Sequence, residues 1–490
     1  MIHLGTADVI IIIIYFAAVV FIGYRSAKRT GTGEEDFLLA GRTLTLPVFV
    51  MTLVSSWYGG VLGVGEFSYR YGLVNWVVQG LPYYIFAALF AFALAKKVRA
   101  TNLYTIPDKL EVSYGRRTAI FGSFLTFVIM TPAPYILMLG VLLEMLFGWS
   151  LPLSLLVTAI VAVSYLYRGG FRSDVQTNVF EFLLMFTGFS LILPYSYWKY
   201  GGLSFLQSTL PPLHLTWNGG NSIQYIIVWF FIALWTLVDP AFHQRCYAAK
   251  NGNVARWGIV CSIFFWLVFD CMTTTAGLYA RAAVPHLSQP MMAYPMLAET
   301  VLPPVIKGIF YVGMLATIMA TLNTLSFVSA QTLGRDFWLR WRHPQLFQSL
   351  HTDSDHHGTN STATRATQAG LIISFLFSAM LALAIPSVVQ LWYTLGTVII
   401  PGLLVPLMAC YFRRLRISAA TAFLAMVLGC GTSMIWFLLR YLPAQNDTYL
   451  FGIEPMYPGL ILSIVVWGVG KVKPSRPNSR DSGIATTNEL

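Results

Sequence analysis

The sequence predicts an all-α protein embedded in a membrane, with about thirteen helices that cross it. The first observation is composition: of 490 residues, 56% are hydrophobic and only 10% are charged, whereas soluble domains carry about 25% charged residues. The second is that apolar runs of about 20 residues, the length that spans a bilayer, recur along the whole chain. The third is that Lys and Arg gather in alternate loops between these runs, as in multi-pass membrane proteins.

Thirteen segments have the length and composition of membrane helices. The longest, 117–147, contains the stretch Thr131–Pro134, whose two prolines should kink or split it. The first segment should be a retained helix, because its basic residues follow the apolar run, whereas those of a signal peptide precede it. The segments are 7–26, 44–66, 73–97, 117–147, 150–168, 175–198, 223–243, 256–284, 304–331, 367–384, 387–410, 416–440 and 455–471.

The loop charges predict the orientation of the chain. Loops rich in Lys and Arg stay on the cytoplasmic side, so we expect a multi-pass plasma-membrane protein (the cell inner membrane in a bacterium) with its N-terminus outside and its C-terminus inside. The net charge of +11 resides in these separate short loops, so no nucleic-acid partner is expected. The basic clusters are Arg25–Arg29, Lys96–Arg99 with Arg116 and Arg117, Arg168–Arg172, Arg245–Arg256, Arg335–Arg342, Arg413–Arg416 and Lys471–Arg480.

Three polar or reactive features are expected to have no binding role. The loop 343–366 contains His and Asp residues that could hold a metal, but a solvated linker fits its composition better. The tail 473–490 is polar and is expected to be disordered in the cytoplasm. The five cysteines form no CxxC pair and lie in or beside apolar segments, so they are expected to be small buried hydrophobes. They are Cys246, Cys261, Cys271, Cys410 and Cys430.

Two segments contain residues that break a helix. The second has paired serines and four glycines within Val54–Glu66, and the seventh has a carboxylate followed by a proline, Asp239-Pro240. The two segments are five apart, and an odd shift inverts direction through the membrane. Broken helices in corresponding positions of two inverted halves point to a transporter binding site near the midplane.

This spacing divides the chain into five parts. Residues 1–30 form an extra N-terminal helix, 36–200 a first five-helix repeat, and 220–411 an inverted second repeat. Each repeat opens with its broken helix. Two further helices occupy 412–472, and 473–490 is the tail.

Enzymatic and ATP-driven functions lack their sequence signals. The chain contains no GxxxxGK[ST] motif for ATP, no HExxH helix and no nucleophile elbow. We therefore expect that the protein is not an enzyme and needs no cofactor.

Five stretches, in order and at fitting spacing between about residues 36 and 440, resemble the sodium:solute symporter family, which has the inverted-repeat fold of the leucine transporter type. They match the entry into and exit from its first core helix, its double-glycine loop, its Gln-Arg stretch and its most recognisable segment. The stretches are DFLLAGRTLTLP, YRYGL, YRGGFRSDVQTNVFEF, DPAFHQRCYAAKN and ETVLPPVIKGIFYVGMLATIMATLNTLSFVSAQTLGRDFW.

The resemblance implies a sodium site between the first broken helix and the last of these stretches. Carried over by position, Ser55, Tyr58 and Thr317 would supply carbonyl oxygens and Thr321 a hydroxyl. Such oxygens suit a hard cation, and a helix break frees carbonyls to supply them. Two positions depart from the family's pattern. Where the family has a hydroxyl residue before Thr321, this chain has Ala320, and where the family has the Asp of its Thr-Asp pair, this chain has Asn178. These departures put sodium affinity and sodium dependence in doubt.

Asp239 can compensate by bringing negative charge to the central cavity, where it would face a coupling cation, a proton or a positive part of the substrate. An ionisable residue within a membrane span is a functional candidate by default. The alternative is that it lies near the cytoplasmic end and pairs with Arg245 or caps a half-helix. Trp57 could stack on a ring-bearing substrate. Gln79 could face the cavity, although an interhelical hydrogen bond is an equal alternative.

The resemblance implies a secondary active transporter that imports a small organic solute with a coupled cation by alternating access. The family handles sugars, amino acids, vitamins and carboxylates, and the sequence does not select among them. Sodium is the expected ion, and a proton-coupled or uncoupled carrier is the alternative. A membrane sensor that does not transport is the alternative of another class, but the tail after Lys471 is short for a signalling domain.

Overall fold

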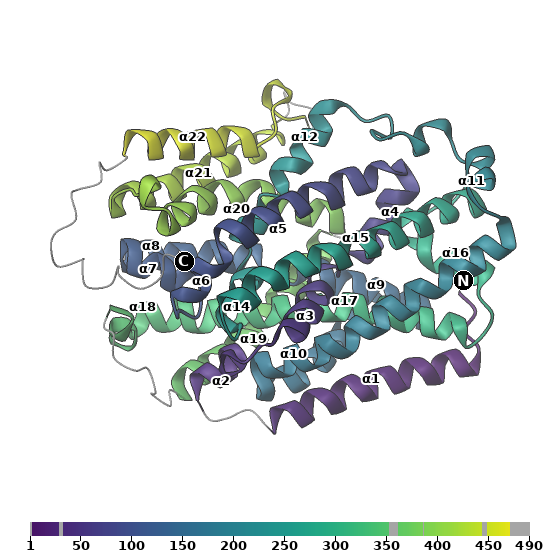
Figure 1. Cartoon of the computed structure of the whole chain (residues 1–490), viewed down its shortest axis with the longest axis horizontal. Coiled ribbons are helices and arrows are strands. Elements are labelled where there is room, and N and C mark those ends of the chain that lie inside the picture. The colour runs from purple at the N-terminus through teal and green to yellow at the C-terminus, as the bar shows by residue number, and fades with distance from the viewer. Residues whose placement is uncertain (1, 29–32, 352–360, 386, 443–447, 471–490) are drawn as a thin grey trace.

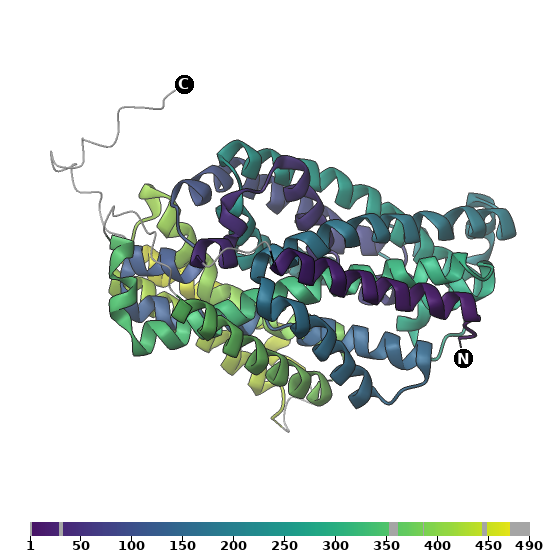
Figure 2. The ribbon, with the colours of Figure 1, turned by 90° about the horizontal axis from the view of Figure 1, so that it is seen from below.

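The computed structural model describes residues 2–28, 33–351, 361–385, 387–442 and 448–470. Long helices run side by side along one axis of the molecule (Figure 1), and the view from below shows the same alignment (Figure 2). Within these ranges the one extended pairing is a β-bridge between Leu44 and Ala249. The all-α fold predicted from the sequence is confirmed. The tail 473–490 and part of the loop 343–366 lie outside the described residues.

The membrane segments form the helices given below, and the remaining short helices of the chain are left out of this description. The first half comprises α1 (Thr6–Ala27), α3 (Leu46–Trp57), α4 (Val61–Tyr71), α5 (Leu81–Ala93), α8 (Arg116–Ile129), α9 (Ala133–Phe147) and α10 (Leu151–Tyr200). The second half comprises α12 (Ile223–Ile232), α13 (Trp235–Val238), α14 (Pro240–Ala248), α15 (Gly252–Ala283), α17 (Ile306–Gln331), α19 (Ser361–Ala384), α20 (Val388–Tyr411), α21 (Ala419–Leu439) and α22 (Met456–Val469).

Ten stretches of the described chain are long and apolar enough to cross a membrane, and the bent pair α3 and α4 makes eleven. Two features leave the expected count of thirteen unconfirmed. Helix α10 has 50 residues, and Gly170 interrupts it with φ 53° and ψ −142°. A straight helix of that length would measure about 75 Å, far more than a bilayer of about 30 Å. Helix α22 is apolar but has only 14 residues.

The expected break in segment 117–147 is present, because α8 ends at Ile129 and α9 begins at Ala133. Between the two arms of α10, the structure has a sharp turn at Gly170 where the sequence suggested a loop. A Cβ on Gly170 would lie 2.5 Å from the carbonyl oxygen of Phe37. Glycine is therefore required at this position both by the positive φ and by the close approach.

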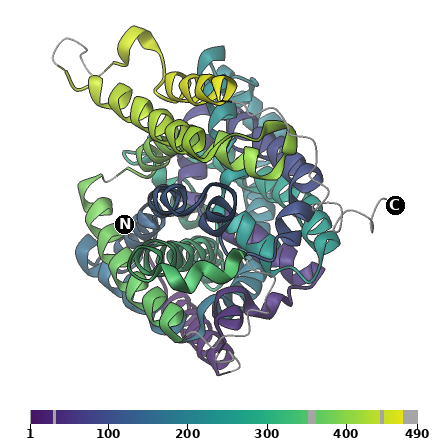
Figure 3. The same cartoon turned by 90° about the vertical axis from the view of Figure 1, so that its left-hand side faces the viewer.

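Helix α17 lies at the centre of the bundle, and 94% of its apolar window is buried. Helix α10 packs along it so closely that a Cβ on Gly188 would lie 2.9 Å from the Cα of Gly313. The end-on view shows α21 and α22, in yellow-green and yellow, at the edge of the bundle (Figure 3). The core that surrounds α17 therefore holds the two broken segments, and α21 and α22 lie outside it.

Candidate functional site: a cavity between two broken helices

The first helix break lies against the central helix α17. Helix α3 ends at Trp57 and α4 begins at Val61, with a bend of 58° between them. The hydroxyl of Thr321 on α17 accepts a hydrogen bond from the Gly59 amide at 2.8 Å and donates one to the Ser55 carbonyl at 3.3 Å. A Cβ on Gly59 would lie 2.3 Å from the Thr321 side chain. Glycine at position 59 therefore allows this close contact.

The structure brings together two of the oxygens expected to hold sodium, the Ser55 carbonyl and the Thr321 hydroxyl. Tyr58 lies in the break itself, immediately after α3. Thr317 lies one turn before Thr321, and its hydroxyl donates to the Gly313 carbonyl of its own helix at 2.6 Å. The ligand expected from Thr317 is its carbonyl. Ala320 is fully buried beside Thr321 and offers no side-chain oxygen.

Asn178, the other candidate for the cation site, lies in a polar cluster between α10 and α17. Its side-chain amide donates to the Thr324 hydroxyl at 3.1 Å, and that hydroxyl donates to Asp174 at 2.8 Å. Arg245 is 3.5 Å from the Asp174 carboxylate, and all four side chains are buried. The side-chain carbonyl of Asn178 has no hydrogen-bond partner among the described residues. Asn178 thus brings no charge to this cluster, and Asp174 is the acid that faces Arg245.

The second helix break is centred on Asp239, whose backbone is extended (φ −66°, ψ 116°) between α13 and α14. One carboxylate oxygen accepts the Phe242 amide at 2.9 Å and the other accepts the Trp235 indole N–H at 2.9 Å. Asp239 thus caps the N-terminus of α14. It does not pair with Arg245, which is bonded to Asp174 and Thr324. A further interruption between α12 and α13, at 233–234, was not predicted.

A cavity of about 130 Å³ lies between the two breaks. The three residues expected to contact solute, Trp57, Gln79 and Asp239, all line it, and so does Thr321. Eight of its twenty lining residues are aromatic: Trp57, Tyr58, Tyr83, Tyr135, Trp229, Trp235, Phe242 and Trp392. A concave, mostly apolar space with a few converging polar groups is typical of a small-molecule site.

Asp270 on α15 is a cavity residue that sequence reasoning did not assign. Its carboxylate accepts hydrogen bonds from the phenols of Tyr58 and Tyr84, and only 3% of the residue is exposed. The available signal was a single carboxylate within the long apolar segment 256–284. That signal could not show which neighbours Asp270 faces, because they come from distant segments.

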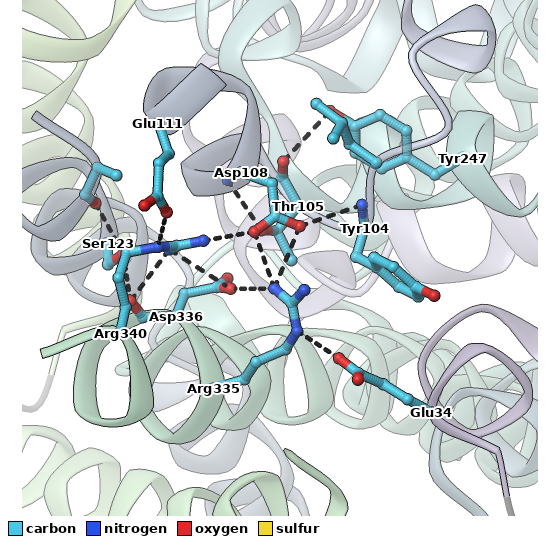
Figure 4. A network of polar contacts seen from close by, with 12 residues as sticks. Glu34, Tyr104, Thr105, Asp108, Glu111, Ser123, Tyr247, Arg335, Asp336 and Arg340 are labelled. Atoms are coloured by element: carbon cyan, nitrogen blue, oxygen red, sulfur yellow. Dashed lines mark hydrogen bonds and ion pairs between the residues drawn. The ribbon is translucent and has the colours of Figure 1, made fainter. Parts of the chain in front are cut away.

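A second polar cluster joins the π-helix η5 (Thr332–Leu339) and α18 (Arg340–Arg342), which follow α17, to the short helices α2 (Glu34–Leu39) and α7 (Ile106–Tyr114), as Figure 4 shows. Asp108 accepts hydrogen bonds from Arg335, at 3.0 Å, and from Arg340. Burial alone would raise the pKa of Asp108, but the two guanidinium groups outweigh burial and hold this pKa below its usual value. The remaining carboxylates of the cluster are Glu34, Glu111 and Asp336.

No group of three or more His, Cys, Asp and Glu side chains in the described part of the chain could hold a metal ion. The oxygens at the first break are carbonyls and hydroxyls. Oxygen atoms of these kinds are the ligands that hard cations prefer.

Comparisons with known proteins show which family this chain resembles. The family model described as "Sodium:solute symporter family" matches residues 37–351. The sodium/pantothenate symporter of Escherichia coli (strain K12) is 28% identical over 489 residues, which cover 94% of this chain and 96% of that protein. Sodium/proline symporter 2 of Staphylococcus saprophyticus is 23% identical and covers 95% of this chain and 92% of its own.

A solved structure of a Na⁺-coupled sialic acid symporter has the same fold. It matches with a TM-score of 0.73 at 15% identity and covers 95% of this chain and 97% of its own. The expected relation to leucine-transporter-type folds is thereby confirmed. Because the matching family and the curated relatives are symporters, the chain is a transporter and not an enzyme. The residues matched by the family model extend over nearly two thirds of the sequence, and therefore the chain belongs to the sodium:solute symporter family.

Proposed function

We propose that this protein imports one small organic solute together with sodium, with the ion at the contact between α3 and α17 and the solute in the cavity between the breaks. The observation that carries the proposal is the position of Thr321. Its hydroxyl contacts the Ser55 carbonyl and the Gly59 amide at the break, and the same residue lines the cavity. An ion bound there and a solute bound beside it would each change the affinity for the other.

The proposed ion ligands are the carbonyls of Ser55, Tyr58 and Thr317 and the hydroxyl of Thr321. Ion binding would replace the hydrogen bonds that now join Thr321 to the break. The ion would thereby hold α3 and α17 in one relative position. Release of the ion on the cytoplasmic side, driven by the gradient and a membrane potential of about 2.3 kcal/mol per charge per 100 mV, would free the two helices to move.

A proton-coupled carrier is the second candidate, and Ala320 favours it. At this position the family's second hydroxyl ligand is missing, and the residue is fully buried. Two buried carboxylates, Asp239 and Asp270, line the cavity, so protonation of one of them would be the alternative way to couple transport to an ion gradient. On this reading the driving ion would bind on the cavity wall, away from α17.

Thermal unfolding of the purified protein separates the two candidates. The protein is titrated with NaCl while KCl keeps the ionic strength constant, and the same series is repeated at several pH values. Sodium coupling predicts a midpoint that rises with sodium and not with potassium, because an ion that binds only the folded state stabilises it. A midpoint that is indifferent to sodium but shifts with pH in the presence of solute would establish the proton-coupled candidate.

The solute is then sought with a panel of sugars, amino acids, vitamins and carboxylates, each added with and without sodium. A coupled solute stabilises the protein more in the presence of sodium than the two separate effects predict. Uptake into proteoliposomes under an inward sodium gradient checks transport itself. Pantothenate and proline belong in the panel because the two relatives are named for them.

The proposal includes the orientation of the chain in the membrane and the boundaries of its repeats. The N-terminus lies outside, the basic loops and C-terminus lie in the cytoplasm, and the protein resides in the plasma membrane. The repeats extend over 36–200 and 220–411, between the extra helix 1–30 and the two helices within 412–472. Single-cysteine labelling of the loops from either side tests this arrangement.

A further inference from the structure

The cavity wall carries two carboxylates and no basic side chain. Asp239 and Asp270 lie on opposite elements, α14's N-terminus and α15, and both line the space. None of the described residues around the cavity is Lys, Arg or His. The charge of Arg245 reaches Asp239, but the Arg245 side chain forms its ion pair with Asp174 in the neighbouring cluster. The ionisable side chains of the cavity wall are therefore acidic, and any charge that they carry is negative.

Every hydrogen bond that the described residues make to these two carboxylates comes from a neutral donor. Asp270 accepts from the phenols of Tyr58 and Tyr84, and Asp239 from a backbone amide and an indole. Each residue is at most 4% exposed. A buried carboxylate without a cation is costly, whereas one paired with a charge and hydrogen-bonded is tolerated. The protein supplies the hydrogen bonds and lacks the cation.

Aromatic side chains form much of the cavity wall. Trp57 packs edge-to-face on Tyr83 and Phe242, with ring centroids 5.6 Å and 5.0 Å apart, so its position is fixed. Trp392 lies against the start of α4, where a Cβ on Gly60 would be 2.3 Å from its ring. Aromatic faces attract a desolvated organic cation. They give no comparable attraction to a carboxylate.

Two indole N–H groups in the wall, those of Trp229 and Trp392, have no hydrogen-bond acceptor among the described residues. Trp229 is 3% exposed, lines the cavity, and its indole N–H has no hydrogen-bond acceptor among the described residues. A buried donor of this kind is expected to meet an acceptor when the site is filled. A solute that carries a hydroxyl or carbonyl oxygen next to its charge would provide one.

We propose that the solute is a small organic ammonium compound, held by Asp239 and Asp270 and covered by the aromatic side chains, with an oxygen that accepts from Trp229. This inference rests on the proposed function, because it assigns the chemical class of the solute to the same cavity. The size is limited: about 130 Å³ is close to the cavity of about 150 Å³ that holds one benzene molecule. The carboxylate of a simple vitamin acid would be repelled by Asp239 and Asp270 there.

Three probes of nearly the same shape test the charge. Choline is the cation, 3,3-dimethylbutan-1-ol is its neutral analogue with carbon in place of nitrogen, and 3,3-dimethylbutanoate is the anion. Each is titrated into the full-length protein in lipid nanodiscs at fixed sodium, and the unfolding midpoint is recorded. We expect choline to stabilise the protein at concentrations at least tenfold lower than the alcohol, and the anion to have no effect.

Variants assign the effect to the cavity. Asp270→Asn should weaken choline about tenfold or more, since its amide can still bond both tyrosines but carries no charge. Trp392→Leu should weaken choline by up to about 30-fold, while Trp392→Phe, which keeps an aromatic face, should recover most of it. Glu144→Gln, on the exposed face of α9, is the matched control and should behave as the unaltered protein.

Equal stabilisation by choline and the neutral alcohol, or stabilisation by the anion, would overturn the inference. So would a choline effect that is unchanged in Asp270→Asn and Trp392→Leu. The proposed function fails separately: if choline stabilises the protein but sodium alters neither the midpoint nor the choline affinity, the ammonium class stands and sodium coupling is wrong. If sodium stabilises the protein and none of the probes does, the ammonium class is wrong and the sodium site stands.

Discussion

Replacement of Thr321 by valine removes one hydroxyl and keeps the shape of the side chain. In the structure this hydroxyl accepts from the Gly59 amide at 2.8 Å and donates to the Ser55 carbonyl at 3.3 Å. Loss of the acceptor leaves a buried amide unpaired, which costs about 1–3 kcal/mol of folding stability. Loss of an ion ligand, taken as equal to a hydrogen bond to a charged group of about 1.5–3 kcal/mol, weakens sodium binding about 10- to 150-fold.

Sodium titrations of the unfolding midpoint measure both effects, the first from the midpoint without sodium and the second from the half-saturating concentration. Thr317→Val is the matched control, because its hydroxyl bonds the Gly313 carbonyl of its own helix and only its carbonyl is a proposed ligand. Thr321→Ser should restore sodium binding. If Thr321→Val binds sodium as the unaltered protein does, or if Thr317→Val weakens it equally, the ion lies elsewhere and the proposed site is wrong.

Three further changes test the surroundings of the site. Ala320→Ser restores the second hydroxyl and should lower the half-saturating sodium concentration about tenfold; an unchanged titration would favour proton coupling. Gly59→Ala places a Cβ 2.3 Å from the Thr321 side chain, so the free energy of unfolding should fall by about 1–3 kcal/mol. If sodium stabilised this variant as fully as the unaltered protein, the close contact would be contradicted. Asp108→Asn leaves Arg335 and Arg340 buried with less countercharge, at a cost of about 3–5 kcal/mol. Since the folded pKa of Asp108 lies below its unfolded value of about 3.9, its stabilisation is complete above that value and is lost as pH falls through the folded pKa. Unfolding curves of Asp108→Asn should lack this acid-dependent component, and an identical pH profile would refute the pairing.

Much of the architecture follows from the sequence for simple physical reasons. Lipid admits only backbone that satisfies its own hydrogen bonds, so long apolar runs become helices and residues such as Pro240 and the glycines of Val54–Glu66 mark where helices stop. The breaks before Ala133 and at Asp239 are found where these residues predicted them. Thr321 was expected at the site from the family resemblance, and Trp57, Gln79 and Asp239 were expected there as aromatic, polar or ionisable residues within membrane segments. All four line the cavity. The interruption at 233–234 has no comparable breaker residue and was missed.

The tertiary structure alone decided which polar side chains meet. Arg245 is six residues from Asp239 in the chain, yet it bonds Asp174, because helix packing turns it towards α10 while Asp239 caps α14. Asp270 is one carboxylate among apolar residues in the sequence and becomes a cavity residue only because Tyr58 and Tyr84 converge on it from other helices. Hydrophobic periodicity is local and determines the helices. The charge of the cavity depends on contacts between residues far apart in the chain, which no local pattern encodes.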